Sequence, residues 1–186
     1  MSLSSAEARD LLARSDLLLT PEEVEQAVVR VAGEITAELS EELPMLLAVM
    51  RGAVVFAGQL LPLLRFPLEF DYLDASRYGT ATRGGELDWR VDVPAGLRDR
   101  TVLIVDDILD EGHTLAAIRR RLLDAGAGRV LIAVFADKDL GKAKPVTADF
   151  IGTSLPNRYV FGFGLDVRGL WRNLPAVYGL RQGEQD

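Results

Sequence analysis

The chain has 186 residues, of which 48% are hydrophobic and 26% are charged, and its formal net charge is −7 at pH 7. That length suits one compact domain with a sizeable core, and the acidic balance disfavours nucleic acid as a partner. The sequence contains no cysteine, which excludes disulfides and thiolate chemistry and is compatible with a cytoplasmic location.

The amino terminus and the longest apolar run give no sign of export or membrane insertion. The first ten residues, MSLSSAEARD, lack a basic segment followed by an apolar core, so we expect no secretory signal. The longest apolar run, residues 43–50, is far shorter than the roughly 20 residues that span a bilayer. Because no internal repeat or long linker is visible, we expect a single cytoplasmic domain over residues 1–186, with no membrane partner.

A helix is the first element that the sequence predicts with a clear start. Thr20 can cap it, Pro21 suits its first position, and Glu23 completes a capping box. Apolar residues then recur at helical spacing as far as Leu39. We therefore predict a helix that begins after Thr20 and ends near Leu39.

Short apolar runs alternate with helical patterns along the rest of the chain. The runs predict strands and cover residues 44–50, 68–75, 87–91, 101–105, 130–135, 150–151, 159–161 and 177–180. Helical spacing follows two of them, at residues 53–64 and 115–122. This alternation predicts an α/β domain with a mainly parallel, twisted sheet flanked by helices. Ligands bind at the carboxyl ends of such strands, which places Arg51, the segment 106–114 and Lys138 at one edge.

The most informative segment is VLIVDDILDEGHTL, residues 102–115, in which an apolar strand leads through two carboxylates into a helix. Asp106 and Asp107 are costly at the end of a buried strand unless they face a ligand, a metal or solvent. The backbone N–H groups at the start of the helix favour an anion. We predict a phosphate-binding loop whose carboxylates bind sugar hydroxyls or Mg²⁺. On spacing alone, an ordinary strand–loop–helix junction with a capping Asp stays open.

This segment resembles the ribose-phosphate signature of type I phosphoribosyltransferases, which transfer ribose 5-phosphate from phosphoribosyl pyrophosphate (PRPP) to a base. The signature is an apolar strand, two acidic residues, two apolar residues, Asp, Thr, Gly, any residue and Thr. The chain keeps all of it except the first Thr, which is Glu111. The resemblance covers residues 46–180 and is closest to hypoxanthine-guanine phosphoribosyltransferase. It implies a core over about 20–140 and a small hood from the N-terminal segment and about 141–186.

The resemblance implies how PRPP is bound. The ribose-phosphate site would comprise the signature residues Asp106, Asp107, Asp110, Glu111, Gly112, His113 and Thr114. Asp110 is implied as the general base, and Asp106 and Asp107 as metal-binding residues. Residues 48–53, AVMRGA, are similar to the family's pyrophosphate loop, which implies a cis Met50–Arg51 bond and pyrophosphate contacts from Arg51 and Gly52.

The resemblance also implies a purine site, further ligand contacts and a lid. Lys138 would hydrogen-bond the 6-oxo group of the purine, Tyr159 would stack on the base, and Val160 would contact the base edge through its backbone. The remaining implied residues are Asp166, which helps to bind both purine and Mg²⁺, Arg172, which contacts pyrophosphate, and Tyr78, in a lid over residues 78–88.

The activity that the resemblance implies is purine salvage with Mg²⁺: PRPP and hypoxanthine or guanine give IMP or GMP and pyrophosphate. Relatives form dimers or tetramers, so a homo-oligomer is expected. Two alternatives remain. One is a xanthine-preferring phosphoribosyltransferase. The other is a regulatory protein that senses PRPP or binds RNA on the same fold, which the charge of −7 and the retained Asp110 disfavour.

Overall fold

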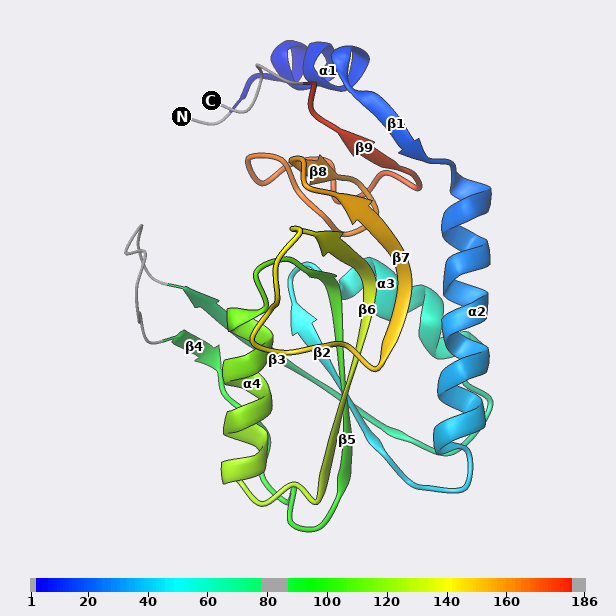
Figure 1. The fold of residues 1–186 in the computed structure, drawn as a ribbon, viewed down its shortest axis with the longest axis vertical. Coiled ribbons are helices and arrows are strands. Elements are labelled where there is room, and N and C mark those ends of the chain that lie inside the picture. Colours follow the sequence, from blue (N-terminus) through cyan, green and yellow to red (C-terminus); the bar gives the residue numbers. More distant parts are fainter. Residues whose placement is uncertain (1–2, 78–86, 182–186) are drawn as a thin grey trace.

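The computed structural model describes residues 3–77 and 87–181, which form two β-sheets (Figure 1). The helices are α1 (Ser5–Arg14), α2 (Pro21–Leu39), α3 (Val54–Leu60) with a 3₁₀ turn η1 (Leu61–Leu63), and α4 (His113–Asp124). The strands are β1 (Asp16–Leu19), β2 (Met45–Met50), β3 (Glu69–Arg77), β4 (Leu87–Val91), β5 (Thr101–Leu109), β6 (Arg129–Asp139), β7 (Phe150–Pro156), β8 (Val160–Phe161) and β9 (Val177–Gly179). Among these described helices, none is long and apolar enough to cross a membrane.

The larger sheet has six strands in the order β4-β3-β2-β5-β6-β7. All neighbouring pairs are parallel except β3 and β4, which are antiparallel. The sheet is strongly twisted, with α2 and α3 packed on one face and α4 on the other (Figure 1). The predicted α/β architecture with a mainly parallel, twisted sheet is therefore confirmed.

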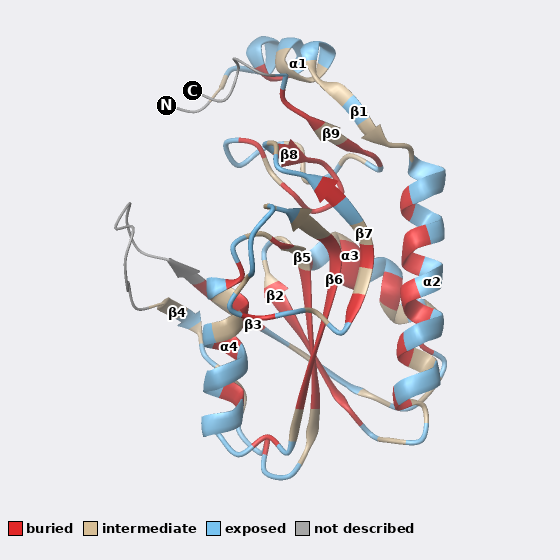
Figure 2. Cartoon of the chain, in the orientation of Figure 1, coloured by how far each residue is buried: buried red, intermediate tan, exposed pale blue. Residues whose placement is uncertain are grey.

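Helix α2 forms where its capping signal predicts it. The Thr20 hydroxyl accepts a hydrogen bond from the Glu23 N–H at 3.3 Å, and the Glu23 carboxylate accepts one from the Thr20 N–H at 2.8 Å. Its apolar stripe, which includes Val24, Ile35 and Leu39, is buried against the sheet, and the opposite face is exposed (Figure 2). Because each such buried side chain contributes about 1.5–3 kcal/mol, the stripe fixes α2 on the sheet.

Strand β5 is longer than predicted, and this changes where the paired carboxylates lie. The predicted strand ends at residue 105, whereas hydrogen bonding to β6 continues to the pair Leu109 and Asp137. Asp106 and Asp107 therefore belong to the strand itself. Strand β6 likewise continues to Asp139, beyond the apolar run at residues 130–135 that predicts it.

The predicted lid over residues 78–88, including Tyr78, lies almost entirely outside the described residues. Its last two positions are described and are not part of a loop. Leu87 and Asp88 pair with Arg77 and Ser76 as the start of β4, which confirms the strand predicted at residues 87–91.

The smaller sheet, of order β1-β9-β8, is antiparallel and joins the two terminal segments into the hood expected from the family resemblance. Asp16 on β1 binds Arg158 at 2.7 Å and Arg181 at 2.9 Å, both nitrogen-to-oxygen distances. The sequence reading assigned no element to α1 or β1. A signal for α1 was present, because Ser4 and Glu7 form a capping box.

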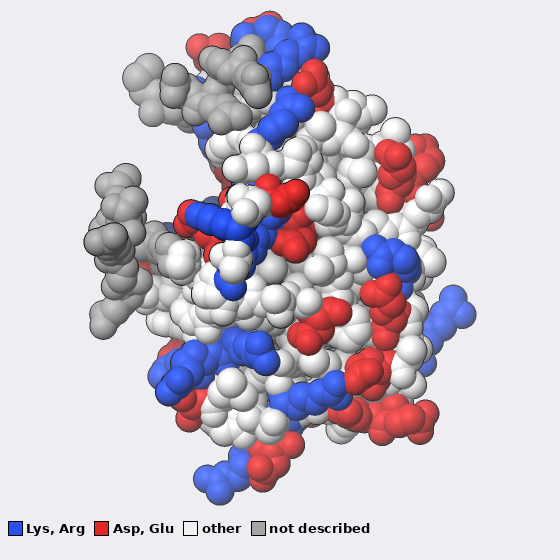
Figure 3. Space-filling model, viewed as in Figure 1, with Lys and Arg blue, Asp and Glu red and all other residues white. Residues whose placement is uncertain are grey.

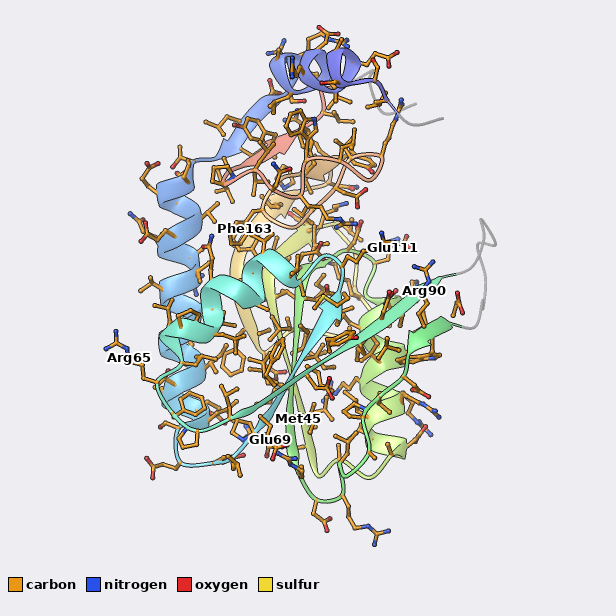
Figure 4. The ribbon with its side chains drawn as sticks, turned by 180° about the vertical axis from the view of Figure 1, so that it is seen from behind. Met45, Arg65, Glu69, Arg90, Glu111 and Phe163 are labelled. Carbon is orange, nitrogen blue, oxygen red and sulfur yellow. The ribbon has the colours of Figure 1, made fainter. Side chains whose placement is uncertain are left out.

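An aromatic cluster attaches the hood to the sheet. The ring centroids of Phe163 and Phe135 lie 4.5 Å apart, and those of Phe135 and Phe56 lie 5.9 Å apart. Phe163 belongs to the segment between β8 and β9 and is seen between hood and sheet in Figure 4. This packing holds the β8–β9 segment over the carboxyl ends of the central strands.

Candidate active site

A cavity of about 490 Å³ lies where the carboxyl ends of β2 and β5 meet the start of α4 and the β8–β9 segment of the hood. Glu111 lies at this end of the sheet, and Met45 and Glu69 mark the opposite end (Figure 4). Most of the predicted site residues line the cavity, namely Arg51, Gly52, Asp106, Asp107, Asp110, Glu111, Gly112, His113, Thr114, Asp166 and Arg172. Segments far apart in the sequence are thus brought to one place, as the rule for parallel sheets predicts.

Asp106 and Asp107 form the electrostatic centre of the cavity. Asp106 is buried, and one of its carboxylate oxygens accepts a hydrogen bond from the Asp107 N–H at 2.9 Å. Burial raises the pKa of both carboxyl groups, and the neighbouring charge of Asp107 raises the pKa of Asp106 further. In the free site, burial therefore destabilises the ionised form of both carboxyl groups. A bound cation or a hydroxyl donor would stabilise that form.

Two glycines let the backbone close around these carboxylates. A Cβ on Gly52 would overlap the carboxylate of Asp107, and a Cβ on Gly164 would overlap the carbonyl oxygen of Gly52. Gly164 also has a φ of +96°, which other residues rarely adopt. The predicted pyrophosphate loop, the paired acids and the hood thus meet without side chains between them. The sequence reading did not single out Gly164.

The start of α4 presents backbone N–H groups to the cavity. Gly112 precedes the helix with a φ of +80°, and it supplies no capping side chain. The first helical hydrogen bond back to it comes from the Ala116 N–H, at 2.9 Å. The N–H groups of the preceding turn, from His113 onward, are therefore available for an anion. The His113 side chain is exposed.

The predicted pyrophosphate loop has the backbone that the family resemblance implies. The Met50–Arg51 peptide bond is cis, which confirms that expectation. Arg51 is exposed and lines the cavity beside Gly52. Its guanidinium group forms no ion pair within residues 3–77 and 87–181, and it is accessible to an anionic ligand.

Asp166 and Arg172 bring hood groups to the same cavity. Both oxygens of Asp166 are engaged, one by the Gly169 N–H at 2.6 Å and the other by Arg172. Arg172 also donates to the Gly164 carbonyl oxygen, and its Nη1 lies 3.8 Å from Asp107 Oδ2. Arg172 thus links the hood to the paired acids, and its charge partly offsets the rise that burial causes in the pKa of both carboxyl groups.

The predicted metal ligands do not form a closed protein site. Within residues 3–77 and 87–181, no group of three or more His, Cys, Asp or Glu side chains could hold a metal ion. Asp166 is already held by Arg172. Asp106 and Asp107 remain, and Mg²⁺ is commonly bound by one or two carboxylates together with substrate phosphates and water. The donor set therefore fits Mg²⁺ that arrives with a phosphorylated substrate.

The predicted purine residues are more dispersed than the PRPP residues. Lys138 Nζ lies 2.7 Å from Asp110 Oδ2 and faces a second cavity of about 340 Å³. The Tyr159 side chain is 40% exposed, whereas Val160 is buried and pairs with Gly179 in the hood sheet. Neither Tyr159 nor Val160 lines the first or second cavity. The exposed ring rules out Tyr159 as an ordinary core aromatic.

One largely buried side chain near the site, that of Lys144, is not among the residues that the sequence predicts. Lys144 donates hydrogen bonds to the backbone oxygens of Leu109 and Lys138 and to the carboxylate of Asp137. It follows β6 in a loop with no apolar pattern, so its burial depends on contacts between segments that spacing does not reveal.

The comparisons with known proteins agree with this geometry. The family described as phosphoribosyl transferase domain matches residues 15–168. Hypoxanthine-guanine phosphoribosyltransferase of Bacillus subtilis is 32% identical over 162 residues, which are 87% of this chain and 90% of that protein. Hypoxanthine-guanine-xanthine phosphoribosyltransferase of Tritrichomonas foetus is 32% identical over 167 residues, which are 89% and 91% of the two chains. The crystal structure of a hypoxanthine phosphoribosyltransferase from Staphylococcus aureus matches with a TM-score of 0.85 and 27% identity over 96% of each chain. The chain belongs to the phosphoribosyltransferase family.

Proposed function

We propose that this protein is a purine salvage enzyme that transfers ribose 5-phosphate from PRPP to hypoxanthine or guanine, giving IMP or GMP and pyrophosphate. The observation that carries the proposal is the cavity that combines two adjacent, largely buried carboxylates, a helix N-terminus and two arginines. A bare polyphosphate would be repelled by Asp106 and Asp107. A ribose that carries phosphate on one side and pyrophosphate on the other satisfies all three features.

In this proposal each part of PRPP has a complementary group. The 5-phosphate binds the N–H groups at the start of α4, with Glu111, Gly112 and His113 contributing backbone and Thr114 its hydroxyl. The ribose hydroxyls donate to Asp106 and Asp107. The pyrophosphate is bound by Arg51, the Gly52 backbone and Arg172, and this arrangement neutralises charge on the leaving group.

Mg²⁺ is the cofactor that this site fits: Asp106 and Asp107 would hold it together with PRPP oxygens, and Asp166 would contribute through water. It would supply charge neutralisation on the departing pyrophosphate. Because burial raises the pKa of Asp106 and Asp107, binding of a cation favours release of any proton that the pair holds. The affinity for PRPP with Mg²⁺ is therefore expected to rise with pH.

The purine end requires a rearrangement of one contact. Lys138 and Asp110 form a direct ion pair at 2.7 Å. A 6-oxopurine can replace it, because its 6-oxo group accepts from Lys138 and its N7 proton is donated to Asp110. Tyr159 offers an exposed ring for stacking, and the backbone of Val160 offers contacts to the base edge.

The chemical step exchanges one bond at C1′ of the ribose. The bond from C1′ to the pyrophosphate oxygen breaks as the bond from C1′ to purine N9 forms, and the ribose carries positive charge in between. Asp110 accepts the purine proton, and Lys138 stabilises negative charge on the base through O6. We propose that Tyr78 belongs to a lid that excludes water, so that the ribosyl cation is not hydrolysed.

Two further properties complete the proposal. The protein is a cytoplasmic homo-oligomer, a dimer or tetramer, which light scattering of the purified chain would test. An additional preference for xanthine is a second candidate, because one relative is named for hypoxanthine, guanine and xanthine. A role as an RNA-binding regulator is disfavoured, since basic and acidic side chains are interspersed on the face shown in Figure 3.

The experiment that tests the proposal compares five bases. Purified protein with Mg²⁺ and PRPP is incubated with hypoxanthine, guanine, xanthine, adenine or uracil, and nucleotide formation is followed for each. We expect turnover with hypoxanthine or guanine and none with adenine or uracil, because Lys138 donates to an oxygen at the 6 position. Turnover with adenine but with none of the other bases would refute the assignment, as would the absence of turnover with all five bases.

A further inference from the structure

Lys144 carries a cation on a largely buried side chain, and the hydrogen-bonding capacity of its ammonium group is fully used. Its side chain is 10% exposed. The ammonium group donates to the Leu109 carbonyl oxygen at 2.7 Å, to the Lys138 carbonyl oxygen at 2.6 Å, and to the carboxylate of Asp137. An ammonium has three N–H donors, so each has an acceptor.

These acceptors lie next to the two residues proposed to handle the purine. Leu109 is the last residue of β5 and directly precedes Asp110. Lys138 is itself one of the acceptors, through its backbone. The ammonium thus joins the end of β5 to the end of β6 immediately beside the ion pair between Asp110 and Lys138.

The chain contains few lysines, and the position of Lys144 requires a lysine rather than an arginine. All three lysines of the sequence stand within residues 138–144, and 18 of its 21 basic residues are arginine. A planar guanidinium cannot direct three donors to acceptors on different sides of a point, whereas a compact ammonium can. The geometry around Lys144 calls for lysine for this reason.

We propose that Lys144 is a positioning residue that holds Asp110 and Lys138 at the spacing a 6-oxopurine requires. This inference rests on the proposed function. Lys144 contacts no PRPP group in that scheme and is absent from the lining of the larger cavity. Loss of its ammonium leaves the Asp137 carboxylate and two carbonyl oxygens without their donor. The ends of β5 and β6 then relax, and Asp110 and Lys138 move apart.

The test compares Lys144→Met, which keeps the length of the side chain and removes its charge, with Lys142→Met as the matched control. The Lys142 side chain is 65% exposed, and its nearest carboxylate, Glu111, is 3.9 Å away. For Lys144→Met we expect kcat/KM for hypoxanthine to fall about tenfold or more, with KM for PRPP changed by less than about threefold. Lys142→Met should keep both constants within about twofold.

A chemical rescue separates positioning from a general effect on folding. Because the sequence has no cysteine, Lys144→Cys introduces a unique thiol, which can be alkylated in denaturant before refolding. Bromoethylamine restores an ammonium at nearly the length of lysine, and iodoacetamide adds a neutral group. The proposal predicts that kcat/KM for hypoxanthine recovers to within about threefold of wild type only with bromoethylamine.

Each outcome decides the inference. Unchanged purine constants in Lys144→Met, or equal recovery with both reagents, would overturn it, as would a rise in KM for PRPP in step with the loss for hypoxanthine. If the position-144 variants do not fold, Asp137→Asn decides the inference. This variant keeps an acceptor oxygen for Lys144 and loses only the charge of the carboxylate, so we expect a smaller loss of kcat/KM for hypoxanthine, about threefold or more, with KM for PRPP little changed. Wild-type constants would overturn the inference. Wild-type protein without activity on any base would instead refute the proposed function.

Discussion

The two ends of the candidate site differ in how far they are built before any ligand is present. At the ribose-phosphate end, Asp106, Asp107 and Gly52 meet at the ends of two neighbouring central strands, and their contacts are close. At the purine end, Lys138 is occupied by Asp110 while Tyr159 stands exposed in the hood. One end is fixed by strand pairing, and the other depends on contacts between separate segments.

This difference has a physical origin. The ribose-phosphate residues lie on the central strands and at the start of one helix, where hydrogen-bond ladders and a buried core fix the backbone. The purine residues come from the end of β6 and from the hood, and one ion pair has to exchange partners when a base binds. We therefore expect variants at the first end to affect PRPP binding, and variants at the second to affect the purine.

The largest expected effect is that of Asp110→Asn, at the junction of the two ends. Removal of a general base typically lowers a rate by 10²–10⁴-fold, so we expect kcat to fall by at least tenfold with KM for PRPP little changed. Steady-state kinetics with hypoxanthine measures both. Asp124→Asn, an exposed acid paired with Arg120 at the end of α4, is the control, and turnover of Asp110→Asn near that of wild type would remove Asp110 from its role.

The second effect tests the rigidity of the ribose-phosphate end. Gly52→Ala places a methyl group on the Asp107 carboxylate, so we expect KM for PRPP to rise about tenfold or more as the loop and the acid move apart. Gly58→Ala is the matched control in α3, because a Cβ there meets nothing within 4 Å. It should leave KM unchanged and stabilise the fold by about 0.4–1 kcal/mol. Equal kinetics for the two variants would contradict a closely packed loop.

The third effect tests the purine end alone. Lys138→Ala removes the donor proposed for the 6-oxo group and leaves Asp107 and the α4 N-terminus untouched. We expect the dissociation constant of the purine to rise by about tenfold, with that of PRPP within about twofold. Isothermal titration of each ligand gives both values. If purine affinity is unchanged, Lys138 is only a surface residue, and the division of the site into two ends fails.

The smallest effect concerns stability and pH. Burial raises the pKa of Asp106 in the folded protein, so the folded chain binds a proton more tightly than the unfolded chain. The stability that this carboxyl contributes is present at low pH and is lost as the pH rises through its raised pKa. Asp106→Asn should therefore stabilise the ligand-free protein by about 1 kcal/mol at neutral pH, and by less toward pH 4.

Urea unfolding across this pH range measures that difference. Adding PRPP with Mg²⁺ should reverse it, because ligand binding stabilises the wild type through the same carboxylate. A variant that is less stable than wild type at neutral pH without ligand would show that Asp106 is not a strained group in the free site.

Features that depend on local spacing could be predicted from the sequence, whereas features that depend on contacts between separate segments could not. Thr20 and Glu23 start α2 through contacts three residues apart, and residues 102–115 carry their strand, acids and helix start in one continuous segment. Local spacing suffices for such features. The end of β5 at Leu109 depends on pairing with β6. The apolar spacing within β5 alone predicts that the strand ends at residue 105, four residues earlier.

Long-range contacts account for what the sequence did not show. Gly164 is required by the backbone of Gly52, and Lys144 by acceptors from two strands. Asp16 connects β1 to Arg158 and Arg181 at the other end of the chain. No periodicity marks these residues, because their contacts join separate segments that only the fold brings together.

The most direct test of the central claim is the stoichiometry of the reaction. Protein, Mg²⁺ and PRPP are combined with and without hypoxanthine, and pyrophosphate, IMP and remaining hypoxanthine are quantified over time. The site proposed here predicts equal amounts of IMP formed, hypoxanthine consumed and pyrophosphate released, with little pyrophosphate released when the purine is absent. Pyrophosphate release that does not depend on hypoxanthine, or no release with either hypoxanthine or guanine, would contradict it.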